Sequence, residues 1–293
     1  MAERSTWPGF WPDDPREEPK RLTLVTERDY VGGADRPLES ISATQGMKIA
    51  MIDIECSPNL AYAYQMWNTN ITPEKLVEPQ KILCFSVKWK GADYTSFYAD
   101  WTVGEEEMLA KLHYYLDEAH ALIHYNGERF DVPHINRELL LHGFPPPSPF
   151  KNIDLYRTVK KKFAFTYNGL DYVSKQLGLP GKTRKISFEM WVALMNGDPE
   201  VRRLVEEYNI GDVEALDVLH DRLLPWIHGH PSHAAFTGEH VCPNCGSSNL
   251  ERRGYAHTAV SQYQRYVCKN CGKWSRGTKK IDGVQIREVA AAG

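Results

Sequence analysis

The sequence predicts an α/β fold in which helices flank a mixed β-sheet, with a small cysteine-rich module after it. Apolar runs of strand length and segments of helical periodicity begin at Lys48. Three strand-like runs come first, helix and strand then alternate, and helices alone follow, which is the order expected of a mixed sheet. Two C-x-x-C pairs near the C-terminus define the smaller module.

Length and composition indicate a globular protein of about two domains, because the chain has 293 residues. Hydrophobic residues make up 42% and charged residues 25%. The net charge of -3 gives no global basic field, so any surface that binds nucleic acid must be local. No apolar run approaches the roughly 20 residues of a membrane span, and the N-terminus lacks the apolar segment of a secretory signal. We therefore expect a cytoplasmic protein, or a viral protein acting in the host cytoplasm, with no membrane partner.

Residues 1–45 are expected to form an extended N-terminal arm. They combine proline, tryptophan and charges of both signs without periodicity. Trp7 and Trp11 could dock on the protein body or on a partner, but a poorly ordered tail fits this composition equally well.

The elements of the main domain follow in order along the chain. Strands are predicted at 48–56, 81–89, 94–99 and 121–126, and helices at 104–119 and from Pro133 to Gly143. A proline-rich connection then leads to a short strand at 151–155 and to several helices that end at Leu224. The pattern breaks at 225–240. We accordingly predict a main domain at 46–225, a linker at 226–239, a cysteine module at 240–283 and a tail at 284–293.

The first strand carries two acids in the run "MIDIEC". Asp53 and Glu55 are two residues apart, so in an extended chain both side chains point to the same face. Two like charges on one buried-looking edge repel each other and cost desolvation unless a cation lies between them. The pair therefore indicates either an edge strand whose acids face water or a cation site.

Two later segments carry further candidate groups. Asp131 follows a predicted strand and starts a helix, where α/β folds place ligand-binding groups. Tyr208 and Asp212 are four residues apart, so on a helix both face one side. Taken singly, Asp131 would be interpreted as a helix cap, Tyr208 as half-buried core and Asp212 as a solvated acid.

Taken together and in this order, the motifs resemble those of the DEDD family of 3′–5′ exonucleases. They are Asp53-x-Glu55 on a first strand, Asn126 with Phe130-Asp131 after a later strand, and Tyr208-x-x-x-Asp212 on a late helix. The spacing is similar to that of the subclass with tyrosine beside the last aspartate. The resemblance covers roughly 47–224, and 168–178 is similar to a helix that often lies between the second and third motifs. It implies a ribonuclease H-like fold.

The resemblance also implies a mechanism with two Mg²⁺ or Mn²⁺ ions, for which hard oxygen ligands are suited. Asp53 would bridge both ions, Glu55 and Asp212 would complete the first, and Asp131 would hold the second partly through water. Tyr208 would orient the attacking water.

Residues near these motifs are predicted less directly. Asn126 and Phe130 are expected to shape the pocket for the terminal nucleotide, although Phe130 could be part of the core. Asp154 is interpreted as a solvated acid at a strand end rather than as a support for the site. A local basic region, which is either a solvated face or a contact for the phosphate backbone, comprises Lys160, Lys161, Lys162, Lys182, Arg184 and Lys185.

Four cysteines predict a structural zinc ribbon at the C-terminus. Cys242 and Cys245 form the first C-x-x-C pair and Cys268 and Cys271 the second, with 22 residues between the pairs. The intervening segment has the alternation of a hairpin and mixes arginine with tyrosine, a mixture that suits nucleic acid. The other two cysteines, Cys56 and Cys84, are expected to be buried in strands without a role, and the linker histidines are assigned none.

The leading hypothesis is a metal-dependent 3′–5′ exonuclease acting on single-stranded DNA 3′ ends, in replication, repair or proofreading in trans with a replication protein partner. One alternative keeps the chemistry and acts on RNA 3′ ends. The other is a non-catalytic accessory protein that binds nucleic acid. The presence of all four acids argues against the accessory protein.

Overall fold

The computed structural model describes residues 46–67, 69–181 and 186–283. All of these belong to one compact unit. The predicted arm at 1–45, the basic residues Lys182, Arg184 and Lys185, and the tail at 284–293 lie outside the described residues.

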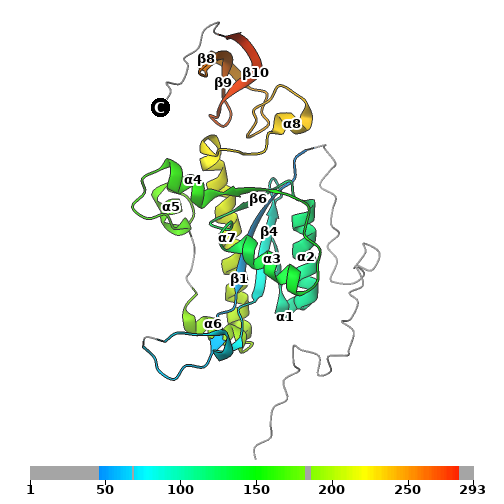
Figure 1. Cartoon of the computed structure of the whole chain (residues 1–293), viewed down its shortest axis with the longest axis vertical. Helices are drawn as coiled ribbons and strands as arrows, with labels where there is room; N and C mark the ends of the chain where they lie inside the picture. The colour runs from blue at the N-terminus through cyan, green and yellow to red at the C-terminus, as the bar shows by residue number, and fades with distance from the viewer. Residues whose placement is uncertain (1–45, 68, 182–185, 284–293) are drawn as a thin grey trace, which may run out of the picture. The chain divides into compact units, whose positions relative to one another are not determined.

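A five-stranded mixed sheet forms the centre of the main domain, in the order β5-β4-β1-β6-β7 (Figure 1). Its strands are β1 (Ile49–Cys56), β4 (Ile82–Trp89), β5 (Ser96–Ala99), β6 (Ala121–His124) and β7 (Lys151–Asp154). β1 pairs with β4 and β4 with β5 in antiparallel register, whereas β1, β6 and β7 are parallel neighbours. The predicted mixed sheet is therefore confirmed, and each of its strands lies at a predicted position.

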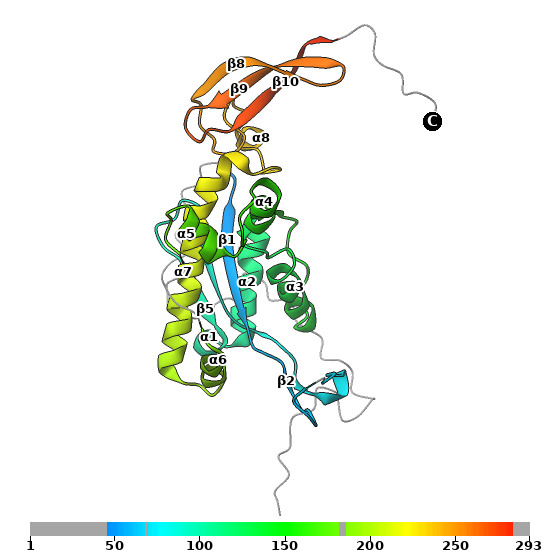
Figure 2. The same cartoon turned by 90° about the vertical axis from the view of Figure 1, so that its left-hand side faces the viewer.

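Helices cover both faces of this sheet, as Figure 2 shows with α7 on one side of β1 and α3 on the other. The helices are α1 (Asp100–Val103), α2 (Glu105–Glu118), α3 (Asp131–Leu141), α4 (Leu155–Lys162), α5 (Leu170–Gln176), α6 (Phe188–Met195) and α7 (Pro199–Leu223). α3 begins two residues before the predicted start at Pro133, because Asp131 already belongs to its first turn. α7 starts at an Asp198 cap, whose carboxylate accepts from the backbone N–H groups of Glu200 and Val201.

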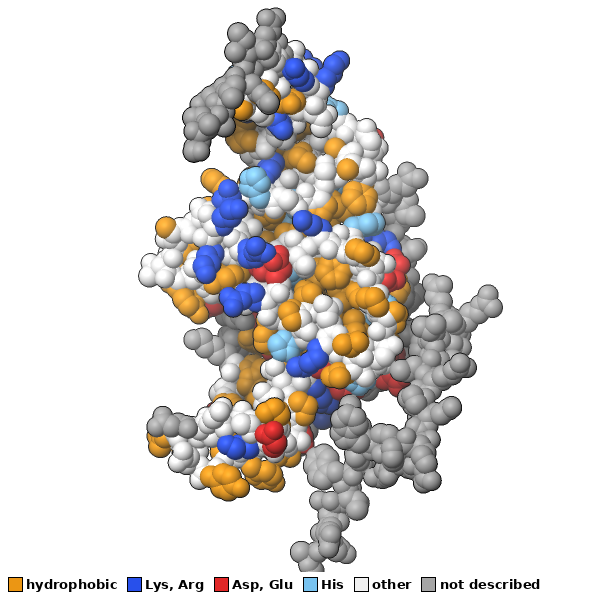
Figure 3. All heavy atoms as spheres, viewed as in Figure 1, with side chains coloured by type: hydrophobic (Ala, Val, Ile, Leu, Met, Phe, Trp, Pro, Cys, Tyr) orange, Lys and Arg blue, Asp and Glu red, His pale blue; other side chains and the backbone are white. Residues whose placement is uncertain are grey.

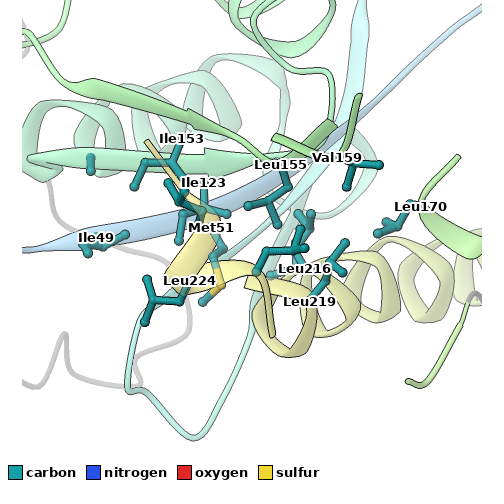
Figure 4. Packing of buried hydrophobic residues seen from close by; sticks show 14 of the residues in the cluster. Ile49, Met51, Ile123, Ile153, Leu155, Val159, Leu170, Leu216, Leu219 and Leu224 are labelled. Atoms are coloured by element: carbon teal, nitrogen blue, oxygen red, sulfur yellow. The ribbon is translucent and has the colours of Figure 1, made fainter. Parts of the chain in front are cut away.

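The alternation of side chains along β1 separates two cores. Met51 joins Ile123 and Ile153 of the neighbouring strands against Leu216 and Leu219 of α7 (Figure 4). The alternate residues of β1, such as Ile52, point to the other face of the sheet and pack against α2 and α3. Because Asp53 and Glu55 follow Met51 at intervals of two, β1 carries both acids on the α7 face.

A hairpin that the sequence did not predict projects from the end of β1. It contains β2 (Leu60–Ala61), the 3-10 helix η1 (Pro73–Lys75) and β3 (Leu76–Glu78), with β2 paired antiparallel to β3. Its apolar residues are exposed, and Tyr64 and Trp67 are the clearest examples. Their exposure explains why burial patterns did not indicate these short strands.

The segment 225–240 is more ordered than the predicted linker. It contains part of the 3-10 helix η2 (Leu224–Trp226) and all of α8 (His233–Thr237). Ile227 is buried in the α7-side core. The Asn244 amide donates to the Leu224 carbonyl at 2.8 Å, and Lys273 Nζ donates to the Ile227 carbonyl at 2.7 Å. The segment thus has fixed contacts with both cysteine-containing turns and with the α7-side core.

The C-terminal module is a three-stranded antiparallel sheet in the order β10-β9-β8. β8 (Leu250–His257) and β9 (Ser261–Cys268) form the predicted hairpin, and β10 (Trp274–Gly283) adds a strand that was not predicted. None of the helices in the described ranges combines the length and the apolar composition that crossing a bilayer demands.

Candidate active site and metal centres

Three carboxylates from two elements meet beside β1. Oxygens of Asp53, Glu55 and Asp212, one from each residue, lie within 4.8 Å of one another. Asp53 and Glu55 come from the α7 face of β1, and Asp212 comes from the buried face of α7 with only 2% of its surface exposed. Sequence reasoning therefore selected three residues that the fold brings together, although Asp212 lies more than 150 residues after Asp53 and Glu55 along the chain.

Asn209 is part of this site and was missed at the sequence level. It is fully buried, and its Nδ2 donates to Asp53 Oδ2 at 2.8 Å and to the Asp53 carbonyl at 3.2 Å. Its position three residues before Asp212 places both side chains on the same face of α7. The available signal was a polar residue on the apolar stripe that includes Val205, Val213 and Leu216.

Asp131 contacts β1 from the start of α3, through a hydrogen bond to the backbone of the strand. It is buried at the start of α3, and its Oδ1 accepts from the backbone N–H of Ile54 at 3.3 Å. Ile54 separates Asp53 from Glu55, so Asp131 contacts the backbone between the two strand acids. Burial raises the pKa of Asp131, while His124 and the Ile54 N–H oppose the rise. Within the described residues, Asp131 does not belong to the close group of three carboxylates.

A tight turn at 126–130 connects β6 to α3. Asn126 adopts the left-handed conformation with φ of 67°, and its carbonyl accepts from the N–H groups of Arg129 and Phe130. Gly127 is required here, because a Cβ at this position would lie 2.5 Å from the His124 ring. The turn thus fixes the direction in which the chain enters α3.

Buried polar groups support this turn from below. His124 Nδ1 accepts from the Gly127 N–H at 3.0 Å, so its Nε2 carries the proton and donates to Asn152 Oδ1 at 3.0 Å. Asp154 accepts from the Asn126 N–H at 2.9 Å and also caps α4. Asp154 is only 6% exposed, so its interpretation as a solvated acid is wrong. The supporting role of His124 was not predicted, because this residue ends an otherwise apolar strand.

The two aromatic candidates lie at the surface of the site region. Phe130 is 39% exposed, with its ring centroid 4.4 Å from that of His134, so it is not part of the core. Tyr208 is half-buried on α7, one turn before Asp212. Asn126 and Phe130 thus lie on the turn before α3, and Tyr208 lies on α7. Their roles remain predictions.

The carboxylate group suits a hard divalent cation. Its donors are all oxygens, and three ionised carboxylates at this spacing repel one another unless a cation or protons offset the charge. Mg²⁺ and Mn²⁺ prefer such donors. Asp53, Glu55 and Asp212 are thus the residues that would hold an ion, with Asn209 orienting Asp53.

The four module cysteines suit zinc. Their sulfurs all lie within 4.8 Å of one another. Cys242 and Cys271 sulfurs are 3.7 Å apart and those of Cys245 and Cys268 are 3.6 Å apart. A tetrahedron with Zn–S bonds of about 2.3 Å has edges of about 3.8 Å. Burial alone would raise the pKa of Cys268, but the N–H groups of Cys271 and Asn270 help to lower it to about 7. The cluster is therefore compatible with a zinc ribbon.

The chain was compared with known protein families, curated sequences and solved structures. A family model described as the RNase H superfamily matches residues 75–224. No sequence among curated proteins matches. Among solved structures, the family B DNA polymerase from the hyperthermophilic archaeon Pyrobaculum calidifontis is similar, with a TM-score of 0.47 and 17% identity. That alignment covers 61% of this chain and 25% of the polymerase, so the chain spans about a quarter of the polymerase's length.

The mixed sheet with helices on both faces defines a ribonuclease H-like fold. The chain belongs to the RNase H superfamily. The matched region includes Asp131, Tyr208 and Asp212 but begins after Asp53 and Glu55.

Proposed function

We propose that the protein is a metal-dependent 3′–5′ exonuclease of the DEDD tyrosine subclass that hydrolyses phosphodiester bonds at single-stranded DNA 3′ ends. The observation that supports it best is the meeting of Asp53, Glu55 and Asp212 on one face of β1. Such a group is unfavourable as a purely structural feature, because the three charges repel one another. A family whose fold commonly carries nucleases makes a phosphodiester the natural substrate.

The proposed roles follow from where each residue lies. Two divalent cations, when bound, supply positive charge for the phosphate and acidify the attacking water. Asp53, Glu55 and Asp212 would hold the cations, and Asp131 would contribute from the start of α3. Tyr208, on the helix that carries Asp212, positions the water through its hydroxyl.

Substrate contacts are proposed on the turn at 126–130. Phe130 exposes enough of its ring to contact a terminal base, and Asn126 is held by Asp154 in the conformation that presents the turn. A single-stranded end suits such a site, because a base within a duplex offers no free face for stacking.

The C-terminal module is proposed to be a zinc ribbon at 240–283 that binds nucleic acid beside the catalytic domain at 46–225. Arg265 lies 4.8 Å from the Trp274 ring centroid, and Arg276 lies 4.2 Å from that of Tyr263. Trp274 is exposed and Tyr263 partly buried. Arginines paired with such aromatic rings offer phosphate contact and stacking in the same place. A replication protein as partner is part of this proposal.

The test is incubation of the full chain with 5′-labelled single-stranded DNA and RNA, with Mg²⁺, with Mn²⁺ and without added metal. We expect a ladder of shortened 5′-labelled DNA that depends on metal. Asp212→Asn should abolish it, whereas Glu214→Gln, on the exposed face of the same helix, should not. Release of the label as a mononucleotide would reverse the polarity. Preferential RNA cleavage would change the substrate, and binding without any cleavage would indicate an accessory protein.

A further inference from the structure

A pocket lies between β7, α4, η2 and the segment that follows η2. Its volume is about 240 Å³, and its lining includes Lys151, Lys161, Lys162, Trp226 and His228. The volume is below the roughly 300–1,000 Å³ of sites that enclose a whole small molecule. The pocket therefore fits one portion of a longer ligand.

Positive charge dominates this pocket. Within the part of the chain that the structure describes, no ion pair involves Lys151, Lys161 or Lys162. Of the two acids in the lining, Glu128 is paired with Arg157, and Asp154 is buried and binds the N–H of Asn126. Figure 3 shows lysine and arginine side chains gathered over the region of α4 and α5.

The charges act on one another, which shows how closely they gather. The pKa of His228 is lowered chiefly by the Lys162 ammonium and then by Lys273, with smaller effects of burial and of Lys161. The lowered pKa favours the neutral imidazole of His228, which can offer a hydrogen-bonding group without further repulsion. A polyanion entering the pocket would relieve the repulsion among the lysines.

An aromatic wall completes the pocket. Trp226 is 53% exposed, and its ring is braced edge-on by Phe163 at a centroid distance of 5.3 Å. A braced, exposed tryptophan beside these lysines is the combination that binds single-stranded nucleic acid, because bases stack on the ring while ammonium groups contact phosphates. Folded acidic peptides would satisfy the lysines but leave the ring without a planar partner.

The pocket is also connected to the candidate active site. Glu128 belongs to the turn that carries Asn126 and Phe130, and Asp154 joins that turn to the floor of the pocket. We propose that the pocket is a subsite for the single-stranded chain at a distance from its cleaved end, with Lys161 and Lys162 on phosphates and Trp226 against a base. This rests on the proposed nuclease function for its substrate, but binding can be measured without cleavage.

The experiment measures the affinity of the full chain for oligo(dT) and oligo(U) of two to about twelve nucleotides, without added divalent metal. We expect the affinity to rise stepwise once the strand is long enough to reach the pocket. In Lys162→Glu the step should shrink by about tenfold in affinity, and the salt slope should fall by about 0.7 for each phosphate that the variant no longer neutralises. Lys160→Glu is the matched control, because it lies in the same last turn of α4 but does not line the pocket. It should change affinity by less than about twofold.

Trp226 provides the second measurement. Trp226→Ala should weaken binding of the long strands about fivefold or more, and Trp226→Phe should restore most of that affinity, because phenylalanine can still stack. Equal effects of Lys160→Glu and Lys162→Glu, or affinity without a length step, would overturn the subsite. A wild-type chain that shows the step but never cleaves would instead overturn only the nuclease.

Discussion

Asn209 donates its side-chain amide to both the carboxylate and the backbone carbonyl of Asp53, at 2.8 and 3.2 Å. This pair of hydrogen bonds ties α7 to β1 where the acids meet. It fixes the orientation of Asp53 before any cation binds. Helix α7 therefore supplies both the Asp212 carboxylate and the Asn209 amide that orients Asp53. Groups that orient metal ligands in this way are commonly needed for tight metal binding.

Asn209→Ala is expected to weaken divalent-metal affinity by about 10–100-fold, because Asp53 loses the donor that orients it. The affinity for Mn²⁺ is measured by titration calorimetry and, independently, from the rise in Tm as Mn²⁺ is added. Glu214→Ala, on the exposed face of α7, is the control and should leave the affinity unchanged. Equal metal affinity in the Asn209 variant would show that β1 alone orients Asp53.

The sequence predicted those parts of the site that depend on local patterns. The apolar run around Asp53 and Glu55 sets both strand and face, and the four-residue interval from Tyr208 to Asp212 sets a shared helix face. For Asn209 the local pattern offered only a polar residue on an apolar stripe, and its hydrogen bonds to Asp53 could not be predicted, because they depend on which strand α7 packs against. Asp154 was misjudged for the same reason: its burial comes from a turn that only the tertiary fold brings over it.

Asp131→Asn is expected to stabilise the metal-free protein at neutral pH, while abolishing cleavage. Burial raises the pKa of Asp131, so its charge destabilises the folded state whenever the group is ionised. For an acid with a raised folded pKa, stability falls as pH rises above the unfolded value, because the folded state binds the proton more tightly. The advantage of the variant should therefore shrink as the pH is lowered through the raised pKa.

Urea unfolding at several pH values checks this expectation. Asparagine keeps an oxygen that can accept from the Ile54 N–H, so the local geometry is retained. Asp117→Asn is a control, since Asp117 lies on α2 and its pKa is lowered by hydrogen bonds from Ser148. A pH-independent gain in the Asp131 variant would mean that its charge is already compensated without metal.

Tyr208→Phe is expected to reduce kcat by about 10–10³-fold with little change in Tm, because it deletes the hydroxyl and keeps the half-buried ring. The assay is single-turnover cleavage of a labelled strand at saturating enzyme. Metal affinity should be unchanged, which separates this variant from Asn209→Ala. Turnover equal to that of the wild type would leave the tyrosine a packing role only.

Asp217→Asn is expected to cost about 1–3 kcal/mol of unfolding free energy, because it removes the carboxylate that pairs with two partly buried ammonium groups. Asp217 lies 2.8 Å from Lys88 Nζ and 2.6 Å from Lys90 Nζ, which links α7 to β4 and its following turn. Burial alone would raise the pKa of Asp217, but the two lysines hold it below its usual range. This stabilisation is present above the unfolded carboxyl pKa and is lost as pH falls through the folded value.

Chemical denaturation of the variant from neutral to acidic pH tests both the size of the stability loss and the direction of its pH dependence. The wild type should converge on Asp217→Asn as its carboxylate is protonated. Asp221→Asn is the milder comparison, because Asp221 is 61% exposed and contacts only Lys90 among the lysines of the described residues. A larger loss of stability in Asp221→Asn than in Asp217→Asn would contradict the assignment of the link to Asp217.

Cys268→Ser is expected to abolish binding of one zinc ion per chain and to loosen the end of α7 as well as the module itself. A module this small has too little core to fold without its metal. Asn244 and Lys273, from the two cysteine turns, donate to the carbonyls of Leu224 and Ile227, so unfolding of the module would leave these carbonyls to water. Hydrogen exchange at the Ile227 amide should therefore accelerate together with exchange in β8 and β9, while the amides of β1 stay protected.

Cys56→Ser is the control, since Cys56 lies in β1 away from the cluster. Retained zinc in Cys268→Ser, or unchanged exchange at Ile227, would show that the module and α7 are stabilised independently.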